Sequence, residues 1–429
     1  MRTGLPKPAG MTRRHFLSHL ATTSLALPAL SWLEHMKAHA AQIRKEGKSV
    51  ILLWMSGGPA TIDMWDLKPG ADTGGEFKPI STSVPGIQIS EHLPETAKIM
   101  HHLAIVRSMS TIEADHSRGT YKMHTGYRPS NSMQHPSFGA LVAHQLGPKV
   151  DIDLPHFIAI NTPSIGPGFL GMAYAPFVVR NPGSPIANIK PPGSIDSLRQ
   201  RSRLQYLSFV ENQFIRQRRG RAARDHLDVY QKAVRLMTSE QLEAFDLSKE
   251  DERTKERYGD NSFGRGCLIA RRLVEAGVCF VEVGLGGWDT HSNTFEAHRN
   301  RLQPTVDKAL SALVTDLVSR GLYEKTLVVW MGEFGRTPRI NQNTGRDHYA
   351  RAWSVVLGGC GLAGGAVVGK TNHDGTQVVD RPVDTPDLIA TFCKALGIPT
   401  DLKFITPNGR PYWVVDRNAG AGPIEELFT

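Results

Sequence analysis

The sequence predicts an α/β fold with a mostly parallel central sheet flanked by helices. Continuous apolar runs at 49–55, 278–283, 326–331 and 353–357 each lead into glycine-containing turns. Runs without polar alternation are typical of strands buried on both faces of a parallel sheet. Residues 301–322 instead carry apolar side chains at three- and four-residue spacing, which indicates a helix. Strands that alternate with helices favour a parallel sheet.

The first part of the chain has the pattern of an export signal. Arg13 and Arg14 precede a moderately apolar stretch at 20–33, and small residues near Ala40 suit cleavage. Paired arginines indicate the twin-arginine route. We therefore expect residues 1–41 to be a twin-arginine signal peptide and the twin-arginine translocase to be a partner during export. The protein would then be periplasmic or extracellular. An uncleaved anchor and an ordinary helix are the alternatives.

The rest of the chain, residues 42–429, is expected to form a single α/β domain with a helical insertion at 194–260. Charged and helix-favouring residues predominate in this insertion, and five of its arginines lie close together: Arg216, Arg218, Arg219, Arg221 and Arg224. Aromatic residues are missing around these arginines. We therefore interpret the insertion as a solvated helix face and expect no nucleic acid partner.

Composition excludes several other classes of protein. With 40% apolar and 21% charged residues, the chain is neither disordered nor embedded in a membrane. No later stretch reaches 18 apolar residues, so we expect no stable transmembrane segment after cleavage. The 4 cysteines are widely spaced and form no CxxC pair, which argues against a zinc knuckle. One disulfide is compatible with an oxidising compartment, but the spacing selects no pair.

Acidic and imidazole side chains follow two of the predicted strands. Asp289 and His291 come after the second strand, Glu333 comes directly after the third, and Asp347 and His348 follow within the next loop. Sites of parallel sheets form at the carboxyl ends of the strands, so these side chains can converge on one cation. Each cluster alone could also be a turn. Together they predict one or two divalent metal ions, zinc or manganese, which accept mixed nitrogen and oxygen ligands.

Other polar residues could complete such a site. Asp63 follows the first strand and either reaches the metal or caps a turn. His116, Ser117 and Arg118 stand at the start of a predicted helix, where free N–H groups attract anions. The alternative for this segment is a capping box with exposed charges. Arg336 can hold a tetrahedral oxyanion through its fork of donors, or pair with a glutamate of its own loop.

The order of these motifs resembles the DUF1501 family, twin-arginine-exported bacterial proteins of undefined activity. The resemblance covers nearly all of residues 46–400. The motifs that carry it are Ser56-Gly57-Gly58-Pro59, His116-Ser117-Arg118, Trp288-Asp289-Thr290-His291, Gly332-Glu333-Phe334-Gly335-Arg336-Thr337-Pro338 and Gly345-Arg346-Asp347-His348.

That family is in turn similar to the alkaline phosphatase and sulfatase superfamily. Residues 116–129 are similar to the sulfatase signature, so the resemblance implies an alkaline phosphatase/sulfatase-like fold. Ala114 stands where the sulfatase cysteine would be, which excludes formylglycine chemistry at that position. Phe334 replaces a usual histidine ligand, and Ser56-Gly57 replaces an acidic one. These departures imply a metal site that is rebuilt, reduced or lost.

We interpret the sequence as an exported metal-dependent hydrolase-like protein that acts on an anionic phosphate or sulfate ester. Arg118 or Arg336 would hold the ester oxygens, and Ser117 or a metal-bound hydroxide would be the nucleophile. His116 would be a general base or an additional ligand. The metal ligands would be Asp289, His291, Glu333, Asp347, His348 and Asp63. The alternative is a non-catalytic binding or assembly protein of the cell envelope on the same fold.

Overall fold

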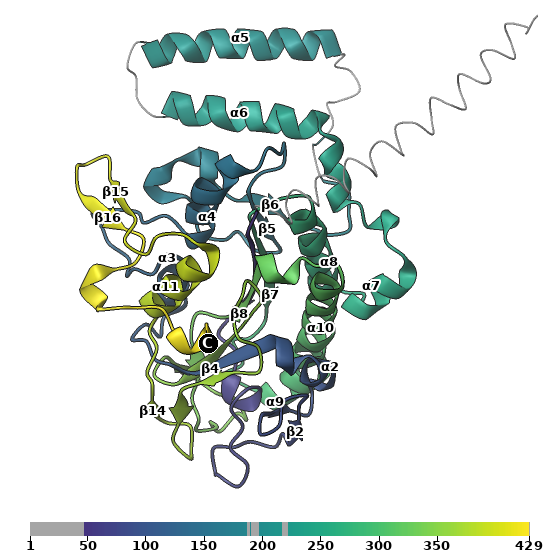
Figure 1. Cartoon of the computed structure of the whole chain (residues 1–429), viewed down its shortest axis with the longest axis vertical. Coiled ribbons are helices and arrows are strands. Elements are labelled where there is room, and N and C mark those ends of the chain that lie inside the picture. The colour runs from purple at the N-terminus through teal and green to yellow at the C-terminus, as the bar shows by residue number, and fades with distance from the viewer. Residues whose placement is uncertain (1–46, 187–188, 190–196, 217–221, 429) are drawn as a thin grey trace, which may run out of the picture.

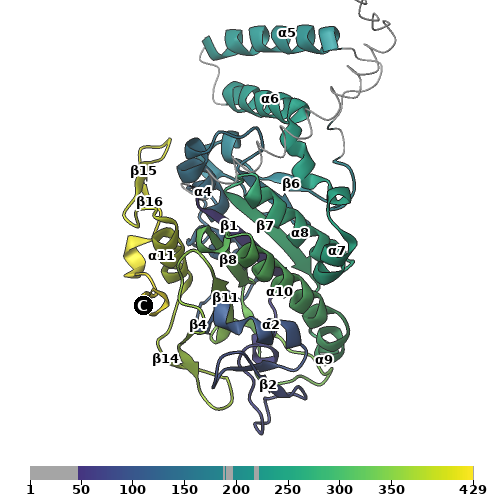
Figure 2. The same ribbon diagram turned by 45° about the vertical axis from the view of Figure 1, so that its right-hand side comes forward.

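The centre of the molecule is an eight-stranded sheet (Figures 1 and 2). The computed structural model describes residues 47–186, 189, 197–216 and 222–428, so the predicted signal peptide at 1–41 lies outside the described residues. From edge to edge the strands are β12 (Val367–Val368), β4 (Leu103–Met109), β11 (Trp353–Gly358), β8 (Thr326–Met331), β1 (Ser49–Ser56), β7 (Phe280–Gly286), β5 (Phe157–Ile160) and β6 (Phe177–Val179).

The sheet is mostly parallel, as predicted. Strand β1 lies between β7 and β8 and is parallel to both. The four predicted strands are present as β1, β7, β8 and β11, but β11 is antiparallel to its two neighbours. A parallel return requires a crossover connection. The segment between β8 and β11 contains instead a short hairpin of β9 (Gly335–Arg336) and β10 (His348–Tyr349).

Helices cover both faces of the sheet. One face carries α2 (Pro94–Lys98), α8 (Ser262–Glu275) and α10 (Gln303–Ser319), and the other carries α3 (His116–Thr125), α4 (Phe138–Leu146) and α11 (Thr385–Leu396). Strand β1 supplies both cores, because Ile51 and Leu53 face α8 and α10 whereas Leu52 and Trp54 face α4 and α11. Successive side chains of a strand point to opposite faces. This two-sided burial explains the continuous apolar runs of the sequence.

Helices also fill the predicted insertion at 194–260. They are α5 (Ser197–Arg216), α6 (Ala222–Thr238) and α7 (Glu252–Tyr258), with short 3-10 turns between α6 and α7. Helices α5 and α6 pack against each other and stand at one end of the molecule, beyond the sheet (Figures 1 and 2). Of the five clustered arginines, Arg218, Arg219 and Arg221 lie outside the described residues.

Two further expectations concern the membrane and the cysteines. In the part of the chain that the structure describes, no helix is both long and apolar enough to cross a membrane. All four cysteines, Cys267, Cys279, Cys360 and Cys393, are buried free thiols. The disulfide that the composition left open is therefore not formed. Burial raises the pKa of every one of these thiols, which keeps them protonated and unreactive.

Candidate metal centre

The candidate centre lies beyond the carboxyl ends of β1, β7 and β8, which is where sites form in parallel sheets. The loop after β7 carries Asp289 and His291, and the β9–β10 hairpin carries His348. Helix α3 starts at His116 and brings this residue in from a different part of the sequence. Residues from three separate connections therefore meet at one edge of the sheet.

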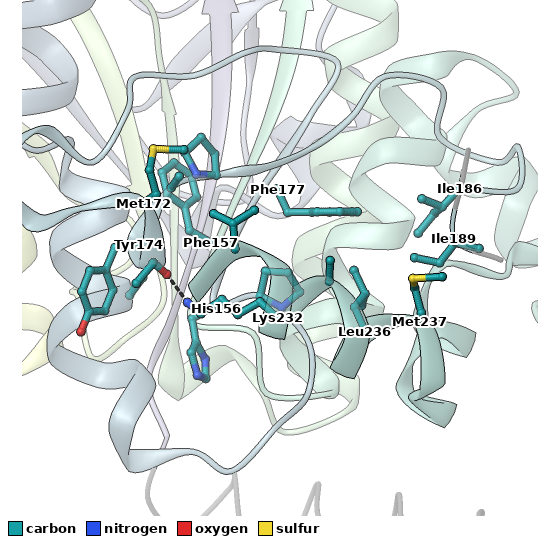
Figure 3. A pocket seen from close by; sticks show the side chains of 17 residues that line it. His156, Phe157, Met172, Tyr174, Phe177, Ile186, Ile189, Lys232, Leu236 and Met237 are labelled. Atoms are coloured by element: carbon teal, nitrogen blue, oxygen red, sulfur yellow. Dashed lines mark hydrogen bonds between the residues drawn. The ribbon is translucent and has the colours of Figure 1, made fainter. Parts of the chain in front are cut away.

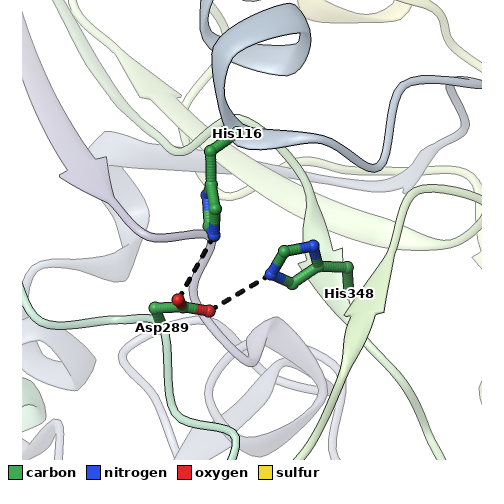
Figure 4. Close-up of side chains that lie close together, drawn as sticks. All are labelled: His116, Asp289 and His348. Carbon is green, nitrogen blue, oxygen red and sulfur yellow. Dashed lines mark hydrogen bonds and ion pairs between the residues drawn. The ribbon is translucent and has the colours of Figure 1, made fainter.

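Three side chains form the core of the cluster: His116, Asp289 and His348 (Figure 4). One potential ligand atom from each lies within 4.8 Å of the others. His116 Nε2 is 3.3 Å from Asp289 Oδ2, and His348 Nε2 is 3.2 Å from Asp289 Oδ1. His291 adjoins this group, because its Nε2 lies 3.0 Å from Asp289 Oδ1 and 3.1 Å from His348 Nε2.

The ring of His116 is fixed from behind by Glu333. His116 Nδ1 lies 2.7 Å from Glu333 Oε1, and the same oxygen accepts a hydrogen bond of 2.9 Å from the backbone N–H of Gly57. The Glu333 side chain is almost fully buried. The structure thus places Glu333 Oε1 behind a histidine of the cluster, while Glu333 Oε2 is buried without a hydrogen-bond partner. Glu333 therefore positions His116, and its role as a ligand stays a prediction.

The other two imidazoles are fixed in the same manner. His291 Nδ1 lies 2.7 Å from Asp347 Oδ1, and His348 Nδ1 lies 2.8 Å from the carbonyl oxygen of Ala114. Asp347 thus positions His291, and its role as a ligand stays a prediction. The hydrogen bond to His291 is the main reason why the pKa of Asp347 is lowered. Metal-binding histidines usually make this second hydrogen bond to a carboxylate or a carbonyl.

Each ring has an acceptor beyond its Nδ1, which is a carboxylate for His116 and His291 and a carbonyl for His348. A ring whose proton is on Nδ1 turns the lone pair of Nε2 toward the Asp289 carboxylate and can bind a cation, whereas a ring protonated on Nε2 donates to that carboxylate. His116 Nε2 is buried without a hydrogen-bond partner. A cation among these atoms would satisfy all of them, so the residues fit a divalent ion such as zinc or manganese.

Arg336 lies beneath the cluster and orients Asp289. Its guanidinium donates to Asp289 Oδ1 and to the carbonyl oxygens of Gly57, Gly58 and Arg346, and its side chain is 0% exposed. Partial burial raises the pKa of Asp289, but the Arg336 hydrogen bond and charge outweigh it and lower this pKa to about 2. The donors of Arg336 are thus already bonded within the protein, so it could hold an oxyanion, its predicted role, only by giving up one of these bonds.

Asp63 is not part of the cluster either. Its Oδ1 and Oδ2 each accept a hydrogen bond of 2.7 Å from the guanidinium of Arg346, and both side chains are 0% exposed. Arg346 also donates to the carbonyl oxygens of Thr337 and Pro338. The predicted metal ligand Asp63 is thus corrected to one half of a buried ion pair that ties the loop after β1 to the loop after β9.

Ser117 and Arg118 lie on the first turn of α3, directly after His116, and both are exposed. Arg118 Nε donates to Glu113 Oε2 at 2.7 Å. Glu113 is buried and also accepts from Arg128 Nε at 2.6 Å. The roles of Ser117 as nucleophile and of Arg118 as holder of the ester oxygens stay predictions.

Two residues that support the histidines of the cluster were not predicted from the sequence. The ring of Phe334 packs against His116 and His348, with ring centroids 5.1 and 4.7 Å apart. A Cβ on Gly345 would overlap the main chain of His291. From the sequence, Phe334 is noted only because it replaces a usual histidine ligand, and Gly345 only because it belongs to a motif. Neither the aromatic support nor the close approach of the two loops could be inferred without the tertiary contacts.

Comparisons with known proteins identify the family and similar folds. The family model described as "Protein of unknown function (DUF1501)" matches residues 47–428. A search of curated proteins finds no match. Similar solved structures include the PsFucS1 sulfatase from Pseudoalteromonas sp., at 12% identity over 86% of this chain and 72% of that chain, with a TM-score of 0.37.

Two further solved structures are similar to the same degree. The phosphonate monoester hydrolase of Agrobacterium radiobacter shares 10% identity over 89% of this chain and 77% of that chain, with a TM-score of 0.37. A protein in the alkaline phosphatase superfamily from Vibrio parahaemolyticus shares 12% identity over 82% of this chain and 67% of that chain, with a TM-score of 0.36. At such low similarity, the chemistry of the centre must be inferred from this chain's own residues.

We expect the substitutions Glu333→Gln and Asp347→Asn to weaken metal binding by roughly ten- to a hundredfold without abolishing it. Each change weakens the hydrogen bond that fixes a histidine but leaves the ligand atoms in place. Metal affinity measured by competition with a chelator checks this. Asp380→Asn, at an exposed position, is the matched control and should have no effect. A complete loss, equal to that of Asp289→Asn, would show that the two carboxylates are ligands.

Asp63→Asn should lower the free energy of unfolding by about 3–5 kcal/mol, because it leaves Arg346 as an uncompensated buried charge. Chemical denaturation measures this value. The protein that remains folded should keep its full metal content, since Asp63 does not face the cluster. The control Glu95→Gln breaks an exposed pair with Lys98 and should cost only about 0–1 kcal/mol. A folded Asp63→Asn protein without metal would restore Asp63 as a ligand.

Proposed function

The chain belongs to the DUF1501 family, and from the geometry of its centre we propose that it is an exported, metal-dependent hydrolase of phosphate or sulfate esters. One observation carries this proposal. The Nε2 atoms of His116, His291 and His348 converge on the Asp289 carboxylate, and each ring is fixed through its Nδ1. A carboxylate surrounded by imidazoles that are each held through Nδ1 suits a mixed nitrogen and oxygen metal site.

The exposure of the centre favours catalysis over a structural role for the metal. Structural metal sites are closed by four protein ligands, whereas catalytic sites keep a position open to water or substrate. The side chains of Asp289, His291 and Asp347 are 47%, 46% and 55% exposed, so the cluster opens to solvent. An open surface centre of this kind suits an ester group carried on a larger molecule.

Different residues of this chain would hold the ion, bind the ester and attack it. When bound, a divalent ion would polarise the ester and stabilise the leaving oxygen. Asp289, kept ionised by Arg336, and the imidazoles of His116 and His348 would hold that ion, which leaves a position for water or substrate. Arg118, released from Glu113, would bind the non-bridging oxygens of the ester, and the positive end of α3 would add to this attraction. Ser117, on the same turn, would act as the nucleophile.

A non-catalytic binding or assembly protein is the second candidate function. The bonding of the two arginines favours it, since Arg336 is fully engaged within the protein and Arg118 is paired with Glu113. Ala114, at the position of the sulfatase cysteine, supplies only a carbonyl oxygen to His348. In this case the metal would stabilise the loops and attract an anionic partner without cleaving it.

Metal analysis of the purified full chain tests both candidates. We expect a divalent transition metal at about one ion per chain, and loss of this metal in His116→Ala and in His348→Ala, because each removes a ligand atom. The control His101→Ala changes an exposed histidine bonded to Ser83 and should keep the metal. Absence of metal from the intact protein, even after incubation with zinc or manganese, would refute the hydrolase.

Activity then separates the two candidates. The metal-loaded protein should hydrolyse aryl phosphate or aryl sulfate esters, and Asp289→Asn should lower kcat/KM by at least about a hundredfold through loss of the metal. Asp380→Asn is again the control. Metal binding without turnover of these esters or of ester-bearing polymers would favour the binding protein.

Export by the twin-arginine route is part of the proposal and has a test of its own. Arg13→Lys combined with Arg14→Lys keeps the positive charge but removes the arginine pair that the twin-arginine route requires. We expect this variant to stay in the cytoplasm, as measured by cell fractionation. The control Arg44→Lys should be exported normally. Equal export of both proteins would contradict the twin-arginine assignment.

A further inference from the structure

A cavity lies at the opposite end of the strands from the candidate metal centre. Its volume is about 310 Å³, and it is enclosed by α6, by the turn Met172–Tyr174 and by the first residues of β5 and β6 (Figure 3). Phe157 and Phe177 open these two strands, whereas the metal centre follows the carboxyl ends of β1, β7 and β8. The cavity is therefore a separate site.

The wall of this cavity is predominantly apolar. Aromatic, branched and thioether side chains form it, among them Phe157, Met172, Phe177, Leu236 and Met237. Methionines adapt their shape to flexible ligands. The volume falls at the lower end of the roughly 300–1,000 Å³ typical of small-molecule sites. The cavity thus suits a slim, flexible and apolar ligand.

The charged group of the cavity wall is a lysine. Lys232 supplies an ammonium group, and none of the described residues that line the cavity is acidic. Lys232 Nζ donates to the carbonyl oxygen of Ala173 and lies 5.6 Å from the ring centroid of Tyr174. Among the described residues, Lys232 makes no ion pair with a carboxylate within 4.0 Å. His156 adds no charge, since burial and the neighbouring Lys232 lower its pKa to about 4.

We propose that this cavity binds an amphiphile with a single acyl chain and an anionic head. The chain would lie among Phe157, Phe177 and Leu236, where its burial from water drives binding. The head would pair with Lys232, which lies toward solvent in α6. A neutral apolar ligand would leave this ammonium with only the charge of Asp228, which lies beyond 4.0 Å, opposite it. A sugar or nucleotide would find too few hydrogen-bond donors and acceptors in the wall.

Displacement of a fluorescent fatty acid tests the proposal on the full chain. Dansyl-labelled undecanoic acid should bind and be displaced by dodecanoate, and less well by dodecanol, which lacks the anionic head. Lys232→Met removes the charge but keeps the length of the side chain, and should weaken dodecanoate by roughly tenfold while leaving dodecanol unchanged. Lys249→Met, at an exposed lysine paired with Glu243, is the matched control.

A second variant tests the volume of the cavity. Ala233→Phe fills the space from α6 and should abolish probe binding, while the thermal midpoint and the metal content show whether the fold is kept. Mass spectrometry of lipids extracted from the purified protein identifies the source of the head. A free fatty acid or a single-chain phospholipid supports the proposal. Absence of probe binding, or equal binding of dodecanoate and dodecanol, would overturn it.

Discussion

Two buried guanidinium groups hold the loops of the centre together, and the arrangement of the ligands depends on them. Arg336 joins the carbonyl groups of Gly57 and Gly58 to the Asp289 carboxylate, and Arg346 joins Asp63 to the carbonyl groups of the neighbouring loop. A buried charge is tolerated only when it is paired and fully hydrogen-bonded. Both conditions are met here, so each arginine fixes loops that are far apart in the sequence. Without them, three connections would have no common anchor at the edge of the sheet.

The sheet could be predicted well because a buried strand is recognisable from its own residues. Strands covered on both faces must be apolar throughout, so β1, β7, β8 and β11 could be located from single runs of residues. No local pattern indicates the direction of β11. Its antiparallel direction goes with the lack of a crossover helix between β8 and β11 in the described chain, and the sequence of this loop does not distinguish it from an ordinary βα connection.

The centre was predicted by residue type and position but not by role. Asp289, His291 and His348 were expected to meet, and they do. Glu333 and Asp347 carry carboxylates, as a metal ligand can. In the structure, however, these carboxylates contact the Nδ1 side of His116 and His291, away from the Nε2 atoms that face Asp289. Asp63 and Asp289 are both paired with a buried arginine, but the Asp63 side chain is 0% exposed and that of Asp289 is 47% exposed. Such distinctions depend on contacts between residues that lie 56 to 283 positions apart, which no local pattern contains.

The aromatic ring of Phe334 has a structural role beside the cluster. It packs against His116 and His348 and offers no ligand atom itself. His116 is brought in by α3, and Glu333 holds its ring from behind. The described residues thus place two imidazoles and one carboxylate close enough to hold a cation, and this juxtaposition depends on an aromatic residue and a buried carboxylate that only the tertiary structure brings together.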